Sequence, residues 1–93
     1  MRLEELFSCP GRLKIIMALL EHGELNISKL ARLSGLNYVA ADKHVRELSR
    51  LGVVVERRLG RARMVSLDDR RPEVRLLGDF IREWRSLFGE TTA

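Results

Sequence analysis

The sequence contains very little cysteine. Cys9 is the single cysteine among 93 residues, so an internal disulfide is impossible, and we expect a small residue placed ahead of Pro10 at a helix start. A reactive thiol or an intermolecular bridge remains the alternative for Cys9. Long apolar runs are also missing, since none approaches the ~20 residues that a membrane-spanning helix needs. The acidic start of the chain, with Glu4 and Glu5, does not resemble a signal peptide. These features predict a cytoplasmic protein with no membrane contact.

Motifs that carry catalysis are absent as well. The sequence has no glycine-rich phosphate loop, no His-Glu-x-x-His and no Cys-x-x-Cys pair. Its two histidines, His22 and His44, are far apart in the chain, and helical periodicity places His44 on a buried face. Because no acid, base and nucleophile are placed together, we predict that the protein is not an enzyme and uses no cofactor.

The sequence does contain enough hydrophobic residues to form a core, together with many charged residues. Hydrophobic residues make up 45% and charged residues 32% of the chain, which is typical of a soluble globular protein. The net charge of +4 suits a polyanionic partner. Fourteen of the seventeen basic residues are arginine, which favours bidentate contacts with phosphate or guanine. GC-rich coding or a thermophilic source would give the same arginine bias. We expect one domain over residues 1–93.

Capping residues and apolar spacing predict a series of helices and one hairpin. The predicted helices cover residues 10–22, 27–34, 38–51 and 72–88, and a shorter helix precedes them with Leu3, Leu6 and Phe7 facing inward. Asn26 and Asn37 are suited to cap the second and third helices. Gly35 and Leu36 make the tight turn between these helices, which is the spacing of a helix-turn-helix. Strands over 53–58 and 61–67, with a turn at 59–61, form the hairpin.

Helical periodicity also predicts the core. The first long helix has an unusually wide apolar arc, which indicates a central helix contacted from two sides. The predicted core residues are Leu13, Ile16, Met17 and Leu20, widened by Ile15 and Leu19, then Leu30, Ala31, Leu33 and Leu36, and finally Ala41, Val45, Leu48 and Leu51.

The third helix is the most informative segment for function. Opposite its buried stripe it carries a second face that combines three basic residues with a tyrosine and a valine, whereas an ordinary solvated face mixes Glu and Lys. A major groove admits such a helix, with its N-terminal residues against base edges. Val39 could contact a thymine methyl group, and Lys43 or Arg46 could donate to guanine. Arg46 and Arg50 lie further along the helix and could contact phosphate instead. Asp42 could accept from cytosine or simply orient Lys43 or Arg46. The candidate DNA-binding residues of this helix are Asn37, Tyr38, Val39, Asp42, Lys43, Arg46 and Arg50.

The positive charge is concentrated on the third helix and the hairpin. Residues 37–63 contain seven basic and three acidic side chains, whereas residues 64–93 contain five basic and six acidic ones. Four arginines surround the hairpin tip: Arg57, Arg58, Arg61 and Arg63. A solvated basic hairpin that binds nothing is the alternative.

Residues 12–36, a helix followed by the first helix of the helix-turn-helix, resemble the first half of an ArsR-type or MarR-type winged helix. Residues 38–54 resemble the recognition helix with Leu48, Gly52 and the strand entry at Val53, and residues 53–67 resemble the wing. The chain is also similar to small archaeal winged-helix regulators that often end in a dimerising helix. The resemblance implies a mainly α fold with a small β-hairpin and an added C-terminal helix. It further implies sequence-specific binding of double-stranded DNA by a homodimeric transcriptional regulator. The wing's role on the adjacent backbone or minor groove would fall on Arg58, Gly60, Arg61 and Arg63.

The sequence departs from metal-sensing ArsR-type proteins, which carry a Cys-x-Cys pair at the start of the second helix. The matching positions here are Asn26 and Ser28, which supply neither thiolate nor imidazole. The last helix contains no histidine, so the alternative metal site of that family is not evident either. We therefore expect no metal.

The last helix carries one unbroken apolar stripe of eight side chains among residues 74–88. Part of this stripe must pack on the chain's own first helix, but a chain this short has little surface left to cover it all. An exposed remainder would be an apolar patch that soluble monomers rarely tolerate. We therefore expect a winged-helix core over 10–67 and a dimerisation helix over 72–88. The predicted dimer contacts are Leu77, Phe80, Ile81, Trp84, Leu87 and Phe88.

Two other partners are alternatives to DNA. A winged helix can also be a protein–protein interaction module of a larger assembly, although charge of this density is unusual at the centre of a protein interface. RNA is a smaller possibility, because the deep and narrow major groove of A-form RNA does not admit a helix.

Overall fold

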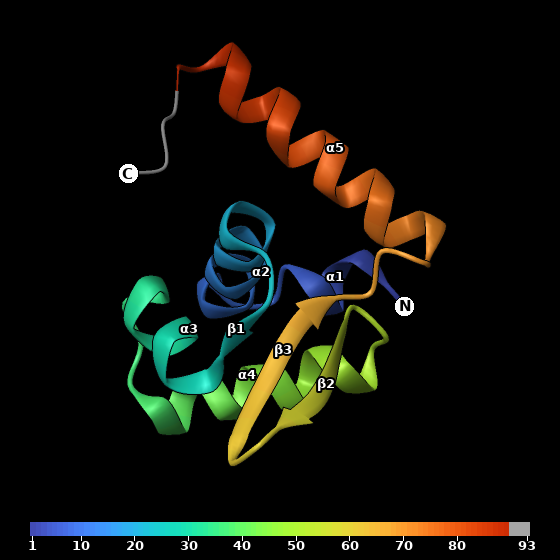
Figure 1. Ribbon diagram of the computed structural model, residues 1–93. Coiled ribbons are helices and arrows are strands. Elements are labelled where there is room, and N and C mark those ends of the chain that lie inside the picture. The colour runs from blue at the N-terminus through green and yellow to red at the C-terminus, as the bar shows by residue number, and fades with distance from the viewer. Residues whose placement is uncertain (90–93) are drawn as a thin grey trace.

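The computed structural model describes residues 1–89 and shows a winged-helix fold (Figure 1). Its mostly helical architecture, with a hairpin and an added C-terminal helix, confirms the predicted fold class. The bounds of the four long helices agree with the predicted ones to within one residue. The elements are, in order, α1 (Leu3–Leu6), α2 (Pro10–His22), β1 (Leu25–Asn26), α3 (Ile27–Ser34), α4 (Tyr38–Arg50), β2 (Val54–Leu59), β3 (Ala62–Leu67) and α5 (Pro72–Leu87).

The hairpin belongs to a three-stranded antiparallel sheet of order β1–β3–β2. Strands β2 and β3 pair over their whole length, with Arg58 opposite Arg63. The two-residue strand β1 lies on the other edge of β3, where Leu25 is opposite Val65. Apolar alternation does not predict β1, because two residues are too few to show a period. At the hairpin tip Gly60 has a φ of 61°, a left-handed conformation that favours glycine.

Helix α2 is central, as its wide apolar arc predicts, but the middle of its buried face lies elsewhere. Ile15, Ile16 and Leu19 are almost completely buried, whereas Leu13 and Met17 are only half-buried. Helices α3 and α4 and strand β3 all contact α2. Ile15 and Leu19, predicted to widen the apolar face, therefore lie at its centre together with Ile16, whereas Leu13 and Met17 lie at its edge, toward α5.

Three residues predicted to face inward are exposed. Leu3 is 67% and Phe7 is 48% exposed, because α1 is a single turn and turns only Leu6 toward the core. Leu33 is 40% exposed, since the short helix α3 contacts its neighbours through Leu30, Ala31 and Ser34 instead. The expectation for these side chains was wrong, and two of them, Leu3 and Phe7, add to the apolar surface near the N-terminus.

Helix α4 has the two faces that its sequence predicts. Ala41, Val45 and Leu48 are completely buried, and Leu51, just past the helix, is half-buried. The predicted caps of α3 and α4 are confirmed: Asn26 Oδ1 accepts from the Lys29 amide at 2.7 Å, and Asn37 Oδ1 accepts from the Ala40 amide at 2.8 Å. These caps satisfy amide groups that the helix itself leaves unpaired and set where each helix begins.

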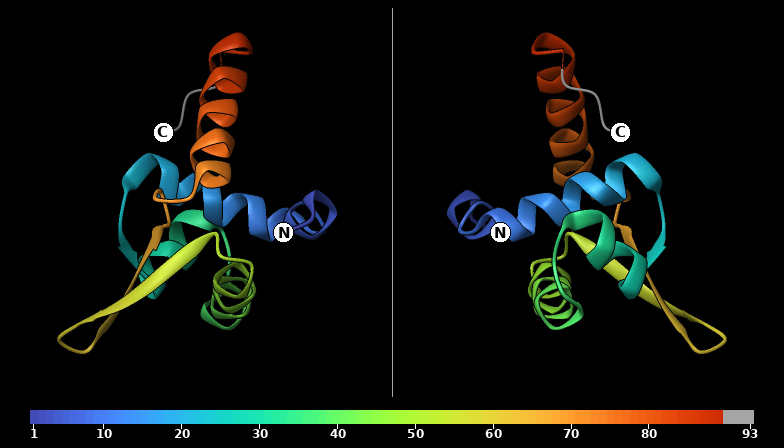
Figure 2. Two further views of the ribbon diagram at one scale, coloured as in Figure 1. Left: turned by 90° about the vertical axis from the view of Figure 1, so that its right-hand side faces the viewer. Right: turned by 90° about the vertical axis from the view of Figure 1, so that its left-hand side faces the viewer.

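Helix α5 projects from the body on the side opposite to the hairpin tip (Figure 2). Only three of its residues, Val74, Gly78 and Ile81, are buried. Gly78 permits a close approach to α2, since a β-carbon there would lie 3.2 Å from Leu20 Cδ1. Within residues 1–89, no helix combines the length and the apolar composition that crossing a lipid bilayer requires.

Candidate nucleic-acid interface

The outward face of α4 presents the side chains that its sequence predicts. Val39 is 77% exposed and Tyr38 is 46% exposed, so an apolar and an aromatic side chain lie beside each other at the start of this face. The Lys43 side chain is exposed, and the Arg46 side chain is 72% exposed. Asn37 is exposed too, and its capping role uses only its side-chain oxygen, so its amide group is free to donate. This face therefore offers hydrogen-bond donors beside an apolar contact.

Asp42 does not point freely from this face, because two arginines bind it. Its Oδ1 lies 2.8 Å from Arg63 Nη1, and its Oδ2 lies 3.2 Å from Arg46 Nη2. Burial of this carboxylate would by itself raise its pKa, but the two guanidinium groups outweigh that effect and hold the pKa below its ordinary value. Asp42 is therefore ionised at neutral pH and orients Arg46, which is one of the two roles considered from sequence.

The four hairpin arginines divide into two pairs. Arg57 makes a two-point contact with Glu24, both distances being 2.7 Å, and the Arg63 side chain binds Glu56 at 2.9 Å. The exposed side chains of Arg58 and Arg61 have no carboxylate partner anywhere in residues 1–89. Of the four hairpin arginines, Arg58 and Arg61 are therefore the two whose charge no carboxylate within residues 1–89 neutralises.

The contact between Glu56 and Arg63 was missed in the sequence, although a signal for it exists. In the observed register Glu56 is diagonal to Arg63 across the hairpin, and such residues lie on one face of a sheet within reach of long side chains. Tyr38 Oη completes the set at 3.5 Å from Arg63 Nη1. The pKa of Arg63 is raised above its ordinary value, first by the hydrogen bond to Glu56 and further by those to Asp42 and Tyr38, against the opposing effect of burial.

Arg50, predicted as a phosphate contact, is also engaged with carboxylates. Its Nη2 lies 3.0 Å from Glu47 Oε2 and 3.5 Å from Glu5 Oε2, and these contacts, Glu47 first, raise the pKa of Arg50. Arg12 reaches the same carboxylate of Glu47 at 3.7 Å and donates to the Glu5 carbonyl. The C-terminal end of α4 is thus tied to α1 and α2, and the free charge of α4 lies toward its N-terminal half.

His44 lies on the inner side of α4, as periodicity predicts, against the start of α2. Its Nδ1 is 3.8 Å from Cys9 Sγ, and a β-carbon on Gly11 would clash with the imidazole. Burial chiefly, then the charges of Arg12 and Lys43, lower the pKa of His44, so the imidazole is neutral at pH 7. Among residues 1–89, no three histidine, cysteine, aspartate or glutamate side chains come together as metal ligands would.

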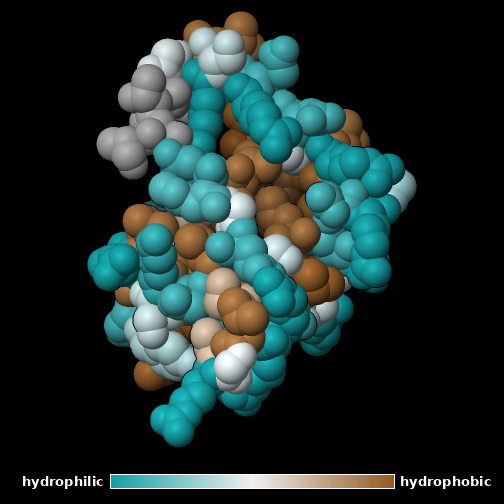
Figure 3. All heavy atoms as spheres, in the orientation of Figure 1, coloured by the Kyte–Doolittle hydropathy of each residue, from teal (hydrophilic) through white to brown (hydrophobic). Residues whose placement is uncertain are grey.

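The apolar stripe of α5 divides between the chain's own core and its surface. Ile81 is only 7% exposed and Leu77 packs partly on the core, which removes Ile81 from the surface offered to a partner. In Figure 3 hydrophobic residues are visible between α5 and the body beneath it. Phe80 stacks on Trp84 with ring centroids 6.0 Å apart, and the Phe88 ring is tilted against Trp84 with centroids 4.8 Å apart. We call the exposed apolar residues the α5 ridge: Leu76, Phe80, Trp84, Leu87 and Phe88, from 50% to 78% exposed.

A groove beside this ridge extends the apolar surface onto the body. It has a volume of about 350 Å³ and lies between α5 and the N-terminal half of the molecule, where Phe7, Leu13 and Met17 line it together with Phe80 and Trp84. Phe7 and Leu76 were not among the predicted contacts. Their exposure follows from the short length of α1 and from how α5 is rotated on the body, neither of which the apolar spacing reports.

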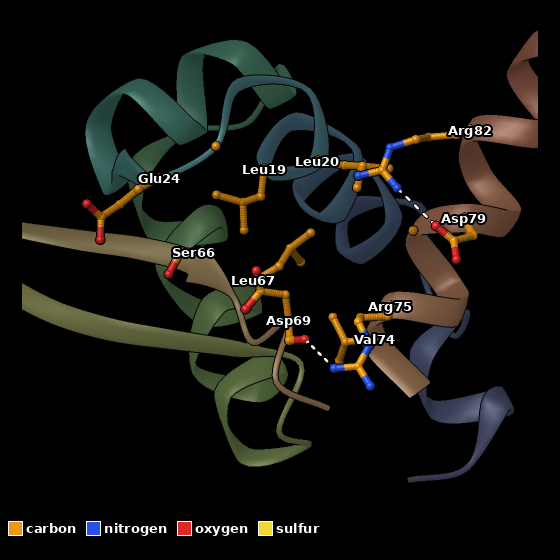
Figure 4. A pocket seen from close by; sticks show the side chains of 12 residues that line it. Leu19, Leu20, Glu24, Ser66, Leu67, Asp69, Val74, Arg75, Asp79 and Arg82 are labelled. Atoms are coloured by element: carbon orange, nitrogen blue, oxygen red, sulfur yellow. Dashed lines mark hydrogen bonds and ion pairs between the residues drawn. The ribbon is translucent and has the colours of Figure 1, made fainter. Parts of the chain in front are cut away.

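A separate cleft of about 520 Å³ lies where α2, β3 and the first turns of α5 meet (Figure 4). Its floor is apolar, with Leu19, Leu67 and Val74. Its rim is polar, but Arg75 donates to the Asp69 carbonyl at 2.9 Å and Arg82 pairs with Asp79 at 3.3 Å. These contacts hold the loop before α5 and the helix itself, so we assign this cleft to the joint between α5 and the body.

The structure is similar to several solved winged-helix proteins. HlyU from Vibrio cholerae superposes with a TM-score of 0.76 at 24% identity, covering 95% of this chain and 88% of that chain. The transcriptional repressor PagR of Bacillus anthracis gives 0.70 at 24% identity, covering 85% and 86%. A homodimeric winged helix-turn-helix DNA-binding domain from Mycobacterium bovis, a possible ArsR-family transcriptional regulator, gives 0.73 at 22% identity, covering 97% and 82%. At these identities the likeness establishes the fold.

The family is established from the sequence instead. A comparison with curated protein sequences gave no match. The family model of the bacterial regulatory proteins of the ArsR family matches residues 9–55, which are half of the 93-residue chain and include α2, α3, α4 and the entry into the hairpin. The chain belongs to the ArsR family of bacterial regulatory proteins.

Proposed function

We propose that this protein is a homodimeric transcriptional regulator that binds double-stranded DNA, with α4 in the major groove and the β2–β3 hairpin on the adjacent backbone or minor groove. The observation that carries the proposal is the combination of an outward α4 face and two hairpin arginines without a carboxylate partner among the described residues, at one end of the molecule and away from α5 (Figure 2). Base edges would meet Asn37, Tyr38, Val39, Lys43 and Arg46, and phosphates would meet Arg58, Arg61 and the backbone at Gly60.

The pairing of charges supports a polyanion as the partner. All three acidic side chains of residues 37–63, namely Asp42, Glu47 and Glu56, are bound to arginines. Lys43, Arg58 and Arg61 are left as exposed bases without an acidic partner in the described part of the chain. Burying such charges at the centre of a protein interface is unfavourable, whereas the phosphates of a DNA duplex can pair with each of them.

The α5 ridge supports the dimer. Five large apolar side chains lie exposed along one helix beside an apolar groove, which is more than a soluble monomer ordinarily presents. A second copy related by a two-fold axis would cover both ridges at once. We accordingly propose residues 10–67 as the DNA-binding core and 72–88 as the dimerisation helix, in keeping with the homodimeric neighbour from Mycobacterium bovis.

The hairpin arginines provide the first test. Replacing Arg58 and Arg61 with alanine removes the unpaired charges, so binding to every duplex should weaken and the salt dependence should flatten. The slope of log Kobs against log[salt] should fall by about one for each phosphate that the variant no longer neutralises. Fluorescence anisotropy of a labelled mixed-sequence duplex, titrated at several salt concentrations, measures both quantities.

A matched control removes the same charge elsewhere. Arg2 and Arg82 are exposed, each paired with a nearby acid, and the Arg2→Ala/Arg82→Ala protein should keep the wild-type slope. Absence of duplex binding by the wild type at low salt would refute the proposal. Stoichiometric capture of an acidic protein that duplex cannot displace would indicate a protein-interaction module instead.

A further inference from the structure

Asp42 connects the recognition helix to the wing through a continuous set of ion pairs. Arg63, on strand β3, lies between Asp42 of α4 and Glu56 of β2, with contacts of 2.8 Å and 2.9 Å. The side chains of Arg63 and Asp42 are only 25% and 19% exposed, so solvent screens this pairing less than it screens a surface pair. These contacts join three elements that are separate in the sequence at the end of the molecule that would face DNA.

The geometry leaves Arg63 with little capacity for a phosphate. Its Nε and Nη2 donate to the two oxygens of Glu56 at 3.2 Å and 2.9 Å, and its Nη1 lies against Asp42 and Tyr38. A guanidinium has five N–H donors in a fixed fork, and here both outer sides of that fork are used. Arg63 therefore differs from Arg61, which lies two residues earlier and has no such partner in residues 1–89.

The same carboxylate holds Arg46 in a defined orientation. Arg46 Nε and Nη2 both lie 3.2 Å from Asp42 Oδ2, so one edge of the guanidinium is bound, while the side chain remains 72% exposed. The other edge still has donors directed away from Asp42. Two parallel donors of this kind match the O6 and N7 acceptors of guanine in the major groove. An arginine already held in place loses less conformational freedom when it makes that contact.

We propose that Asp42 is the positioning residue of the DNA-binding surface, an inference that rests on the proposed function. It orients Arg46 to read one guanine in each half-site through O6 and N7, and it binds Arg63 so that the wing and α4 approach DNA as one rigid unit. Arg63 itself makes no phosphate contact. Asp42 accepts no hydrogen bond from cytosine, because Oδ2 accepts from Arg46 and Oδ1 is buried in an ion pair with Arg63.

The guanine contact is tested with duplexes selected from a random pool by the wild-type protein. Each guanine of the selected site is replaced in turn by 7-deazaguanine, which lacks the N7 acceptor. We expect one guanine per half-site whose replacement weakens wild-type binding roughly tenfold. That sensitivity should disappear in Arg46→Ala and fall in Asp42→Asn. Once Arg46 is alanine, Asp42→Asn should cause no further change in the N7 sensitivity. Arg46→Lys keeps the positive charge but lacks the two parallel donors of the guanidinium, so it should also lose the N7 sensitivity.

The role of Arg63 is tested by salt dependence. Arg63→Gln should weaken binding, because the wing is no longer fixed, yet keep the wild-type slope of log Kobs against log[salt]. Arg61→Ala should lower that slope by about one per protomer. Urea unfolding of each variant reports whether it is folded.

Several results would overturn the inference. One is that Arg63→Gln and Arg61→Ala lower the slope of log Kobs against log[salt] equally. Another is that the N7 sensitivity survives in Arg46→Ala. A wild type that selects a sequence but tolerates 7-deazaguanine at every guanine of it would also overturn it while leaving the proposed function intact. A wild type that binds no duplex at all would overturn both.

Discussion

A Trp84→Glu/Phe88→Glu protein is expected to sediment as a monomer at concentrations where the wild type is a dimer. Both side chains belong to the α5 ridge, and the Trp84 ring contacts those of Phe80 and Phe88 on either side. Each large apolar side chain buried in an interface contributes about 1.5 kcal/mol or more, and a two-fold interface contains each of them twice. The loss of ~6 kcal/mol corresponds to about four orders of magnitude in the dimer dissociation constant.

The control for this variant places one carboxylate on the opposite side of the same helix. Ser86 is exposed on the polar face of α5, so Ser86→Glu should leave the dimer intact. Sedimentation equilibrium distinguishes these states directly. A wild type that remains monomeric at tens of micromolar, with its tryptophan already shielded from soluble quenchers, would show that a single chain satisfies the ridge by itself.

The proposed dimer would also determine how the protein meets DNA. Two chains related by a two-fold axis present two copies of α4, and each copy needs its own half-site. The monomeric variant should therefore keep weak binding to a single half-site but lose the additional affinity for a duplex carrying two, because the second contact is no longer intramolecular.

The second large effect is the loss of stability expected when a side chain on the buried face of α4 is truncated. Leu48 is completely buried in the core beneath this helix, and replacing it with alanine leaves a cavity that costs about 2–5 kcal/mol. Small domains have only about 5–15 kcal/mol of stability in total, so Leu48→Ala should be close to unfolding at 37 °C. The measurement is the urea unfolding midpoint at one fixed protein concentration, since the stability of a dimer depends on concentration.

Val39→Ala on the same helix is the matched comparison. Val39 is 77% exposed, so its truncation should change the free energy of unfolding by less than about 0.5 kcal/mol. It should instead reduce discrimination at the base pair that presents a thymine methyl group to α4. Equal destabilisation by the two substitutions would contradict the assignment of one face to the core and the other to DNA.

Most helix boundaries of this protein could be predicted from its sequence because the residues that set them act locally. Pro10 and Gly23 at the ends of α2, and the two capping asparagines before α3 and α4, determine helix boundaries through local backbone chemistry. The buried stripe of α4 was equally clear, because Ala41, Val45 and Leu48 repeat at helical spacing on a helix contacted from one side.

The burial of Ile81 and the pairing of Arg63 could not be predicted, because both depend on how neighbouring elements pack. Apolar spacing places Ile81 on the same stripe as Phe80 and Trp84, but only the rotation of α5 on the body decides that Ile81 is buried and its neighbours are not. The charge pattern likewise treated Arg58, Arg61 and Arg63 as equivalent. The pairing of Arg63 with Asp42 and Glu56 requires the hairpin register and the approach of α4, which are tertiary facts.

The central claim is that a two-fold dimer reads duplex DNA with α4 while the wing holds the backbone. The most direct test is selection of bound sequences from a random pool of duplexes by the wild-type protein. The account predicts a two-fold symmetric motif whose half-site centres lie about one helical turn, or a multiple of it, apart. It also predicts that the Trp84→Glu/Phe88→Glu protein enriches single half-sites at best. Recovery of a pool with no enriched sequence, or of one asymmetric site bound by a monomer, would contradict it.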